Sequence, residues 1–170
     1  LADSLKLRYD EWFSPLCNVS IPPIPVGYSD SVVIPAHEGF LTGEASYYWS
    51  DNGWSNDWVH RLDNDNSSIY WNLEVAENST HDCFIHYASR EGSSAITLDC
   101  SGERMERELP AFIPVIDKNY SRIDRSAEAI GQTWKRMSMG EIQLQSGSNR
   151  LTLNASNNDL EVLSVILIRK

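Results

Sequence analysis

From about residue 30 onward, apolar and polar residues alternate over short stretches, which is the pattern of strands with one buried and one wet face. The best examples are Ile142–Gln145 and Leu151–Asn154. Turn-forming residues separate these stretches, and many short strands joined by turns predict an antiparallel β-sandwich. The expected strands are Ser31–Pro35, Ala45–Trp49, Val59–Leu62, Ile69–Val75, Cys83–Ala88, Ala95–Asp99, Arg107–Ile116, Thr133–Met139, Glu141–Gln145, Arg150–Asn154 and Val162–Arg169.

The first 28 residues have a different pattern. Leu5, Tyr9 and Trp12 recur at helical spacing and Pro15 interrupts them, which predicts a short helix. The stretch Ile21–Gly27 holds three prolines and is typical of an extended linker. We therefore expect two parts, a helix with a proline-rich linker over residues 1–28 and the β-sandwich over residues 29–170.

Two cysteines flank a predicted turn, Arg90–Ser93. If Glu91 and Gly92 form a two-residue hairpin loop, Cys83 lies opposite Cys100. That register fits a disulfide, which would indicate export to an oxidising compartment. We expect that disulfide, and two small buried thiols are the alternative. A second hairpin is expected between Ile142–Gln145 and Leu151–Asn154.

Composition and charge narrow the function classes. The 170 residues, 41% of them hydrophobic, suffice for one core. With 14 basic and 24 acidic residues the net charge is -10, which opposes charge-driven binding to nucleic acid or to anionic lipid head groups. The longest uncharged apolar run, Val162–Ile168, is interrupted by Ser164 and is far shorter than the roughly 20 residues of a membrane-spanning helix. We expect neither a nucleic-acid partner nor a membrane partner.

The sequence carries no recognisable catalytic pattern. His-Glu-x-x-His, Gly-x-Ser-x-Gly and phosphate-loop motifs are all missing. The adjacent pairs His37-Glu38 and His81-Asp82 would point to opposite faces of a strand, so neither converges on one metal ion. We therefore predict that this chain is not an enzyme in its own right.

Aromatic residues are dense in one polar stretch, residues 47–58. Trp and Tyr beside Asn and Asp offer flat apolar faces next to hydrogen-bonding groups, which is what a sugar ring requires. Trp54 is the best candidate because Asn52-Gly53 and Ser55-Asn56 read as a turn, whereas Trp58 enters an apolar strand and is expected in the core, as is Trp71. The candidate ligand residues of this stretch are Tyr47, Tyr48, Trp49, Asn52, Trp54 and Asn56.

Several segments match a known family in order and spacing. They are Arg8-Tyr-Asp-Glu-Trp-Phe13, Pro25-Val-Gly-Tyr28, Ile34-Pro-Ala-His-Glu38, Leu41-Thr-Gly43, Asn52-Gly-Trp-Ser-Asn-Asp-Trp58, Ile69–Val75, Phe84-Ile-His-Tyr87, Met139–Leu144, Leu151-Thr-Leu153 and Val165–Arg169. Together they resemble the C-terminal appended domain of bacterial formylglycine-dependent sulfatases of the arylsulfatase type. That domain is in turn similar to the galactose-binding-like, jelly-roll sandwiches of carbohydrate-binding modules. The Cys/Ser-x-Pro-x-Arg signature of the sulfatase catalytic centre is missing, so the resemblance concerns only the appended domain.

The resemblance also implies particular sites. Such modules often hold a structural calcium between an early-strand glutamate and an acidic residue of the last strand, which Glu38 and Glu161 match. It further implies ligand contacts from Trp134 and from Asn157 or Asn158, close to the last strand. Two ordinary surface carboxylates are the alternative to calcium.

Two hypotheses for function follow. The first is a non-catalytic carbohydrate-binding module of a secreted or periplasmic bacterial polysaccharide sulfatase, which holds the enzyme on a polysaccharide, sulfated or not. The net charge opposes a sulfated glycan unless basic residues cluster locally, and the clearest such cluster is Arg122, Arg125, Lys135 and Arg136. The second is a purely structural domain that buttresses the sulfatase catalytic domain in cis through the N-terminal helix and linker.

Overall fold

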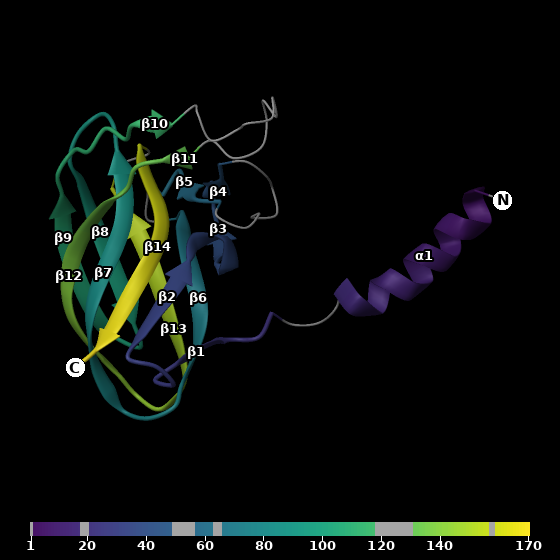
Figure 1. Cartoon of the computed structure of the whole chain (residues 1–170), viewed down its shortest axis with the longest axis horizontal. Helices are drawn as coiled ribbons and strands as arrows, with labels where there is room; N and C mark the ends of the chain where they lie inside the picture. Colours follow the sequence, from purple (N-terminus) through teal and green to yellow (C-terminus); the bar gives the residue numbers. More distant parts are fainter. Residues whose placement is uncertain (1, 18–20, 49–56, 63–65, 118–130, 157–158) are drawn as a thin grey trace.

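The molecule is a sandwich of two β-sheets with one helix outside it, as Figure 1 shows. This computed structural model describes residues 2–17, 21–48, 57–62, 66–117, 131–156 and 159–170. The predicted antiparallel β-sandwich is confirmed, because every strand pair of the described residues is antiparallel except β1 with β6.

Six strands form the first sheet, sheet A, in the order β1-β6-β13-β8-β9, with β3 also paired to β6. They are β1 (Ile24–Val26), β3 (Phe40–Thr42), β6 (Ser68–Val75), β8 (Ser94–Cys100), β9 (Glu103–Leu109) and β13 (Gly147–Ala155).

Six more form the second sheet, sheet B, in the order β12-β7-β14-β5-β4, with β2 paired to β14. They are β2 (Ser31–Pro35), β4 (Ser46–Tyr47), β5 (Val59–His60), β7 (Ser79–Ser89), β12 (Lys135–Leu144) and β14 (Leu160–Arg169). A two-stranded ribbon, β10 (Ile116–Asp117) with β11 (Gly131–Gln132), and a short 3-10 helix, η1 (Ala36–Glu38), complete the sandwich.

Alternating side chains from both sheets fill the core. Ile69, Trp71 and Leu73 of β6 are fully buried, and their neighbours on the same strand are half-buried. Fully burying each such side chain contributes about 1.5–3 kcal/mol of transfer free energy. The indole Nε1 of Trp71 donates to the carbonyl of Pro35 at 2.8 Å, which satisfies its polar atom inside the core. The expectation that Trp71 belongs to the core is confirmed.

Both predicted hairpins are wrong. β7 lies in sheet B between β12 and β14, whereas β8 lies in sheet A between β13 and β9, so the chain crosses the sandwich at the predicted turn. Cys83 pairs with Gly140 and Leu167, and Cys100 pairs with Leu151 and Glu103. β12 and β13 are likewise in opposite sheets. Period-two alternation marks a strand, but it does not tell whether the next strand is a hydrogen-bonded neighbour or faces it across the core.

The predicted disulfide is also corrected, because Cys83 and Cys100 are both free and buried. Burial, with a smaller effect of the neighbouring Cys100, raises the pKa of Cys83 to about 12. Burial raises the pKa of Cys100 to about 11. Both groups therefore behave as small apolar side chains of the core, which is the alternative interpretation of their pattern.

The predicted proline linker contributes a strand to the sandwich. β1 runs parallel to the end of β6, with Ile24 opposite Leu73 and Val26 opposite Val75. Val26 is fully buried. β1 is an edge strand, where Pro25 costs little because an edge strand does not need every backbone N–H. The first strand therefore begins before the expected boundary at residue 28.

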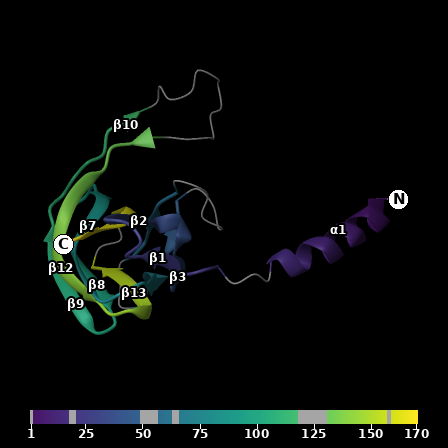
Figure 2. The ribbon, with the colours of Figure 1, turned by 60° about the horizontal axis from the view of Figure 1, so that its bottom comes forward.

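The predicted N-terminal helix is present as α1 (Ala2–Cys17). It projects away from the sandwich in both Figure 1 and Figure 2. Leu5, Leu7, Tyr9 and Trp12 are all more than half exposed, between 54% and 64%. Among the described residues, no helix is long and apolar enough to cross a membrane.

Candidate functional site

The end of the sandwich that carries β3, β4, β5, β10 and β11 is here called the loop end, and it lies at the top of Figure 1. β4 pairs with β5 through Ser46–His60 and Tyr47–Val59, and β5 pairs with β14 through Val59–Val162. These pairings fix where the aromatic stretch 47–58 leaves and re-enters the sandwich.

Four rings meet at the loop end, and we call Tyr48, Trp58, His60 and Trp134 the aromatic cluster. Tyr48 stacks on Trp58 with ring centroids 4.5 Å apart and an interplanar angle of 24°. Trp134 meets Trp58 edge-on at 5.4 Å, and His60 meets Tyr48 edge-on at 5.8 Å. Trp58 is only 4% exposed, which confirms that it is a core residue, whereas Tyr48 is 44% exposed. Trp58 is therefore a buried support and Tyr48 is the accessible ring.

Tyr47, another of the predicted ligand residues, packs inward rather than beside Tyr48. It is partly buried and packs against the core, and its hydroxyl donates to the carbonyl of Gly39 at 2.5 Å. Burial, and secondly the charge of Asp57, raises the pKa of Tyr47. Tyr48, directly after the end of β4, is by contrast 44% exposed.

Polar groups lie close to the aromatic cluster. Asp57 is 1% exposed, and its Oδ1 accepts from the backbone N–H of Trp58 at 2.9 Å. The Nε2 of His60 lies 2.9 Å from the hydroxyl of Ser46. Burial, followed by the charge of Arg61, lowers the pKa of His60, although Glu161 and Asp57 oppose that shift. Near neutral pH the cluster is thus a set of uncharged rings bordered by buried carboxylates.

A second group of side chains connects different segments of the loop end, and we call Arg90, Gln132, Asp159 and Glu161 the Arg90 cluster. Arg90 Nη2 donates to Gln132 Oε1 at 2.9 Å, and Gln132 Nε2 donates to Glu161 Oε2 at 2.6 Å. Arg90 Nη2 also lies 3.5 Å from the same Glu161 oxygen. Asp159 accepts from the backbone N–H groups of Arg90 and Glu91. Sequence analysis missed this cluster because its members come from three distant segments.

The calcium site implied by the resemblance does not fit these residues. Glu38 is exposed at the end of η1. Glu161 is buried, and its Oε2 already has a guanidinium group and an amide N–H as neighbours. Calcium requires six to eight oxygen ligands. In the part of the chain that the structure describes, no group of three or more His, Cys, Asp or Glu residues could hold a metal ion.

Other predicted ligand residues lie outside the described residues, namely Trp49, Asn52, Trp54, Asn56, Asn157 and Asn158. Their described neighbours along the chain are at the loop end. Tyr48 precedes residues 49–56 and Asp57 follows them, and Asp159 of the Arg90 cluster follows residues 157–158. Of the predicted set, the structure therefore brings together Tyr48 and Trp134, both through Trp58.

The outer face of sheet A carries a hollow of about 380 Å³, which sequence analysis did not predict. It is lined by Thr97, Asp99, Arg104, Thr152 and Asn154. Beside it, Tyr70 stacks on Phe40 at 5.1 Å, and the Arg150 guanidinium lies 4.5 Å from the centre of the Tyr70 ring. In the sequence, the hollow is marked only by polar residues at outward positions of separate strands. The order of the strands in the sheet is needed to show that these residues lie side by side.

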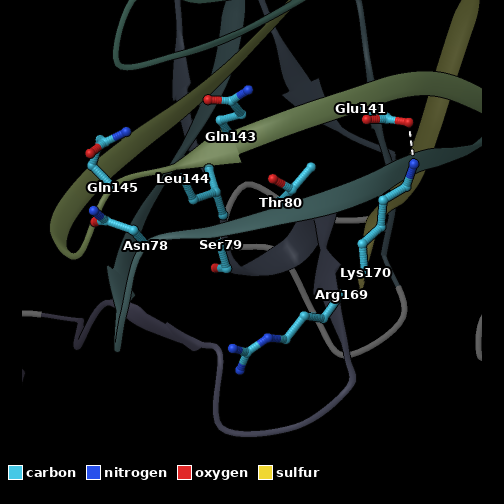
Figure 3. A pocket seen from close by; sticks show the side chains of 9 residues that line it. All are labelled: Asn78, Ser79, Thr80, Glu141, Gln143, Leu144, Gln145, Arg169 and Lys170. Carbon is cyan, nitrogen blue, oxygen red and sulfur yellow. Dashed lines mark hydrogen bonds and ion pairs between the residues drawn. The ribbon is translucent and has the colours of Figure 1, made fainter.

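A larger groove, of about 700 Å³, lies at the opposite end and is shown in Figure 3. Its lining comprises Asn78, Ser79, Thr80, Glu141, Gln143, Leu144, Gln145, Arg169 and Lys170, with no aromatic ring. The charged groups here are paired with protein partners. Lys170 contacts Glu141 and lies 3.5 Å from Asp82, and Arg169 contacts Glu77 at 2.7 Å. We call this surface the C-terminal groove.

No protein-family model and no curated protein sequence matches the chain. Solved structures do match its fold. The GH26-CBM35 β-(1,4)-mannanase of Podospora anserina is 19% identical with a TM-score of 0.62, over 84% of this chain and 28% of that protein. The C-terminal CBM6 of LamC, a marine laminarinase from Zobellia galactanivorans, is 13% identical with a TM-score of 0.56, over 81% of this chain and 98% of that one.

The same fold occurs in other contexts. The mosquito-larvicidal Cry4Aa toxin of Bacillus thuringiensis is 13% identical with a TM-score of 0.64, over 88% of this chain and 25% of that protein. This chain thus spans about a quarter of the mannanase and of the toxin, and it corresponds to nearly the whole CBM6 domain. At these identities the likeness establishes the fold, a β-sandwich of the kind found in carbohydrate-binding modules.

Proposed function

We propose that this domain is a non-catalytic carbohydrate-binding module whose binding surface is the loop end. The observation that carries the proposal is the aromatic cluster, in which an accessible Tyr48 rests on a buried Trp58 and has polar groups around it. The structural neighbours that are CBM6 and CBM35 proteins support it.

The chemistry of a sugar explains why this surface is suited to it. One side of a pyranose ring presents C–H groups and its rim presents hydroxyls. A flat aromatic ring covers the C–H face, while side-chain amides donate to and accept from the rim. A ring that is held from below by Trp58 loses little conformational freedom on binding, so more of the contact energy appears as affinity.

We further propose that the domain belongs to a secreted bacterial polysaccharide sulfatase and holds that enzyme on its substrate. The support is the resemblance of the segments from Arg8 to Arg169 to the appended domains of such enzymes. For sulfated glycans, the candidate basic cluster includes Arg136, but its guanidinium already lies 3.9 Å from the centre of the Phe84 ring. Lys135 is half-buried, and Arg122 and Arg125 lie outside the described residues.

Affinity electrophoresis of this chain against neutral and sulfated polysaccharides tests the proposal. We expect retardation by at least one of them and weaker retardation of Trp54→Ala, because losing one stacking aromatic costs about 2 kcal/mol, roughly thirtyfold in affinity. Tyr28→Ala is the matched control, since Tyr28 is 76% exposed and is outside the loop end. Equal retardation of both variants would exclude the predicted surface, and retardation by sulfated polymers alone would support the sulfated substrate.

One observation favours the structural alternative, a domain that buttresses a catalytic domain. α1 exposes Leu5, Tyr9 and Trp12, which in a longer protein would require a covering surface. In that case Trp12→Ala should lower the melting temperature of the whole sulfatase without changing its retention on polysaccharide. A variant with unchanged stability would remove the support for this alternative.

A further inference from the structure

The guanidinium group of Arg90 takes part in contacts that connect three segments of the loop end. The Arg90 side chain follows the end of β7, Gln132 belongs to β11, and Glu161 lies near the start of β14. The side chain of Glu161 is 9% exposed and that of Arg90 is 33% exposed. A carboxylate this deeply buried is costly unless a cation or hydrogen-bond donors compensate it. Here Arg90 supplies the cation, and the Nε2 amino group of Gln132 supplies a hydrogen-bond donor.

The orientation of Gln132 shows which kind of cation this arrangement accepts. Its Oε1 accepts from Arg90, which leaves the Nε2 amino group to donate to Glu161. A metal ion beside Glu161 would need oxygen ligands where this amino group points. A guanidinium ion is planar, permanently charged and carries five N–H donors, so it can satisfy an amide oxygen and a carboxylate at the same time.

The Arg90 cluster is coupled to the aromatic cluster through the last strand. Asp159 binds the backbone of Arg90 and Glu91, so the turn after β7 is held to β14 by main chain as well as by side chain. β14 then pairs with β5, where Val162 lies opposite Val59, next to Trp58. The charge of Glu161 also acts on His60.

We propose that the Arg90 guanidinium is a built-in cation of the loop end, which takes the place of a bound divalent ion at Glu161. It acts as a positioning group that holds the aromatic cluster without a metal. This goes beyond the proposed carbohydrate binding, and only its consequence for glycan affinity rests on that function.

Thermal unfolding of the full chain, followed by circular dichroism, tests the proposal without any glycan. We expect Arg90→Ala to lower the melting temperature by about 5 °C, because it leaves Glu161 buried and unpaired. Arg104→Ala is the matched control. Arg104 lies 3.8 Å from Glu106 in a pair in which both side chains are about two-thirds exposed, and such surface pairs contribute little.

A second substitution separates a cation role from a merely structural one. If the damage in Arg90→Ala is an uncompensated carboxylate, adding Glu161→Gln should restore most of the lost melting temperature. Additive losses in the double variant would overturn the proposal. Should Arg90→Ala not fold, Arg90→Gln replaces it, because it removes the charge but keeps a hydrogen-bond donor; a melting temperature well below that of Arg104→Ala but raised by adding Glu161→Gln would support the cation role.

Metal dependence gives the remaining measurement. The melting temperature of the unmodified chain should be the same in millimolar calcium and in excess EDTA. A rise with calcium that EDTA reverses would overturn the proposal. These results stand even if the domain retains no polysaccharide. If it does bind one, Arg90→Ala should weaken that binding several-fold while Arg104→Ala does not.

Discussion

The two ends of the sandwich are both rich in polar side chains, yet their chemistry differs. At the loop end, uncharged rings stack beside buried polar groups, and Tyr48 remains accessible. In the C-terminal groove, shown in Figure 3, Lys170 and Arg169 are paired with carboxylates and no aromatic ring lines the surface. The groove is hollow but polar, whereas the loop end combines an apolar face with hydrogen-bonding groups. This difference in chemistry is why we propose the loop end, and not the C-terminal groove, as the binding surface.

The largest expected effect is on the free energy of unfolding, when Trp58 beneath the loop end is removed. Trp58→Ala should lower the free energy of unfolding by about 4 kcal/mol, because it leaves a cavity beneath Tyr48 and removes the stacking partner of two rings. Urea unfolding measures this loss. The matching change in the groove, Gln143→Ala, removes an exposed side chain and should stay within about 0.5 kcal/mol. Equal losses would mean that the loop end is not the better packed of the two.

The next effect sharpens the comparison in binding. Against a polysaccharide that retards the chain, Tyr48→Ala should cost about 2 kcal/mol, roughly thirtyfold in affinity. Gln145→Ala, in the C-terminal groove, should leave affinity unchanged. If the groove variant weakens binding and Tyr48→Ala does not, the assignment of the two ends is reversed.

A smaller effect depends on pH. Burial, and secondly the charge of Arg169, lowers the pKa of His81, which lies on β7 opposite Ile142. A lowered pKa means that the folded state binds fewer protons than the unfolded one, so stability falls as the pH drops below the ordinary value of 6.5. His60 and His86 have lowered pKa values too and add to this slope. Unfolding free energies between pH 8 and pH 5 should show it, and His81→Phe should flatten it. A variant that keeps the full slope would contradict the assignment to His81.

The smallest expected effect belongs to the ion pair of the C-terminal groove. Lys170 pairs with Glu141 at the surface, where water and salt screen the charges. Hydrogen bonding to Glu141 raises the pKa of Lys170, so Lys170 stays charged at neutral pH. Lys170→Gln should change the melting temperature less than Arg90→Ala does, and added salt should shrink the difference further. A change as large as that of Arg90→Ala would show that this ion pair contributes more to stability than an ordinary surface pair.

Local patterns determined the strands and much of the core. The strand pattern of Ile69–Val75 predicts β6 and the burial of Trp71, and the apolar strand that Trp58 enters predicts its burial. The aromatic stretch also indicated the loop end, where Tyr48 is accessible. These features follow from the sequence because each residue's neighbours along the chain decide them.

Only the tertiary structure showed which strands pair with each other. Cys83 and Cys100 lie in opposite sheets, Ile24–Val26 joins an edge of sheet A, and Tyr47 turns toward Gly39 although it stands beside Tyr48. Trp134 meets Trp58, and Arg90 meets Glu161, only because β12, β5, β7 and β14 share one sheet. Alternation is a period along one strand, and it carries no information about which strand pairs with which. The packing of the whole core decides that pairing, and with it the groups that meet at the loop end.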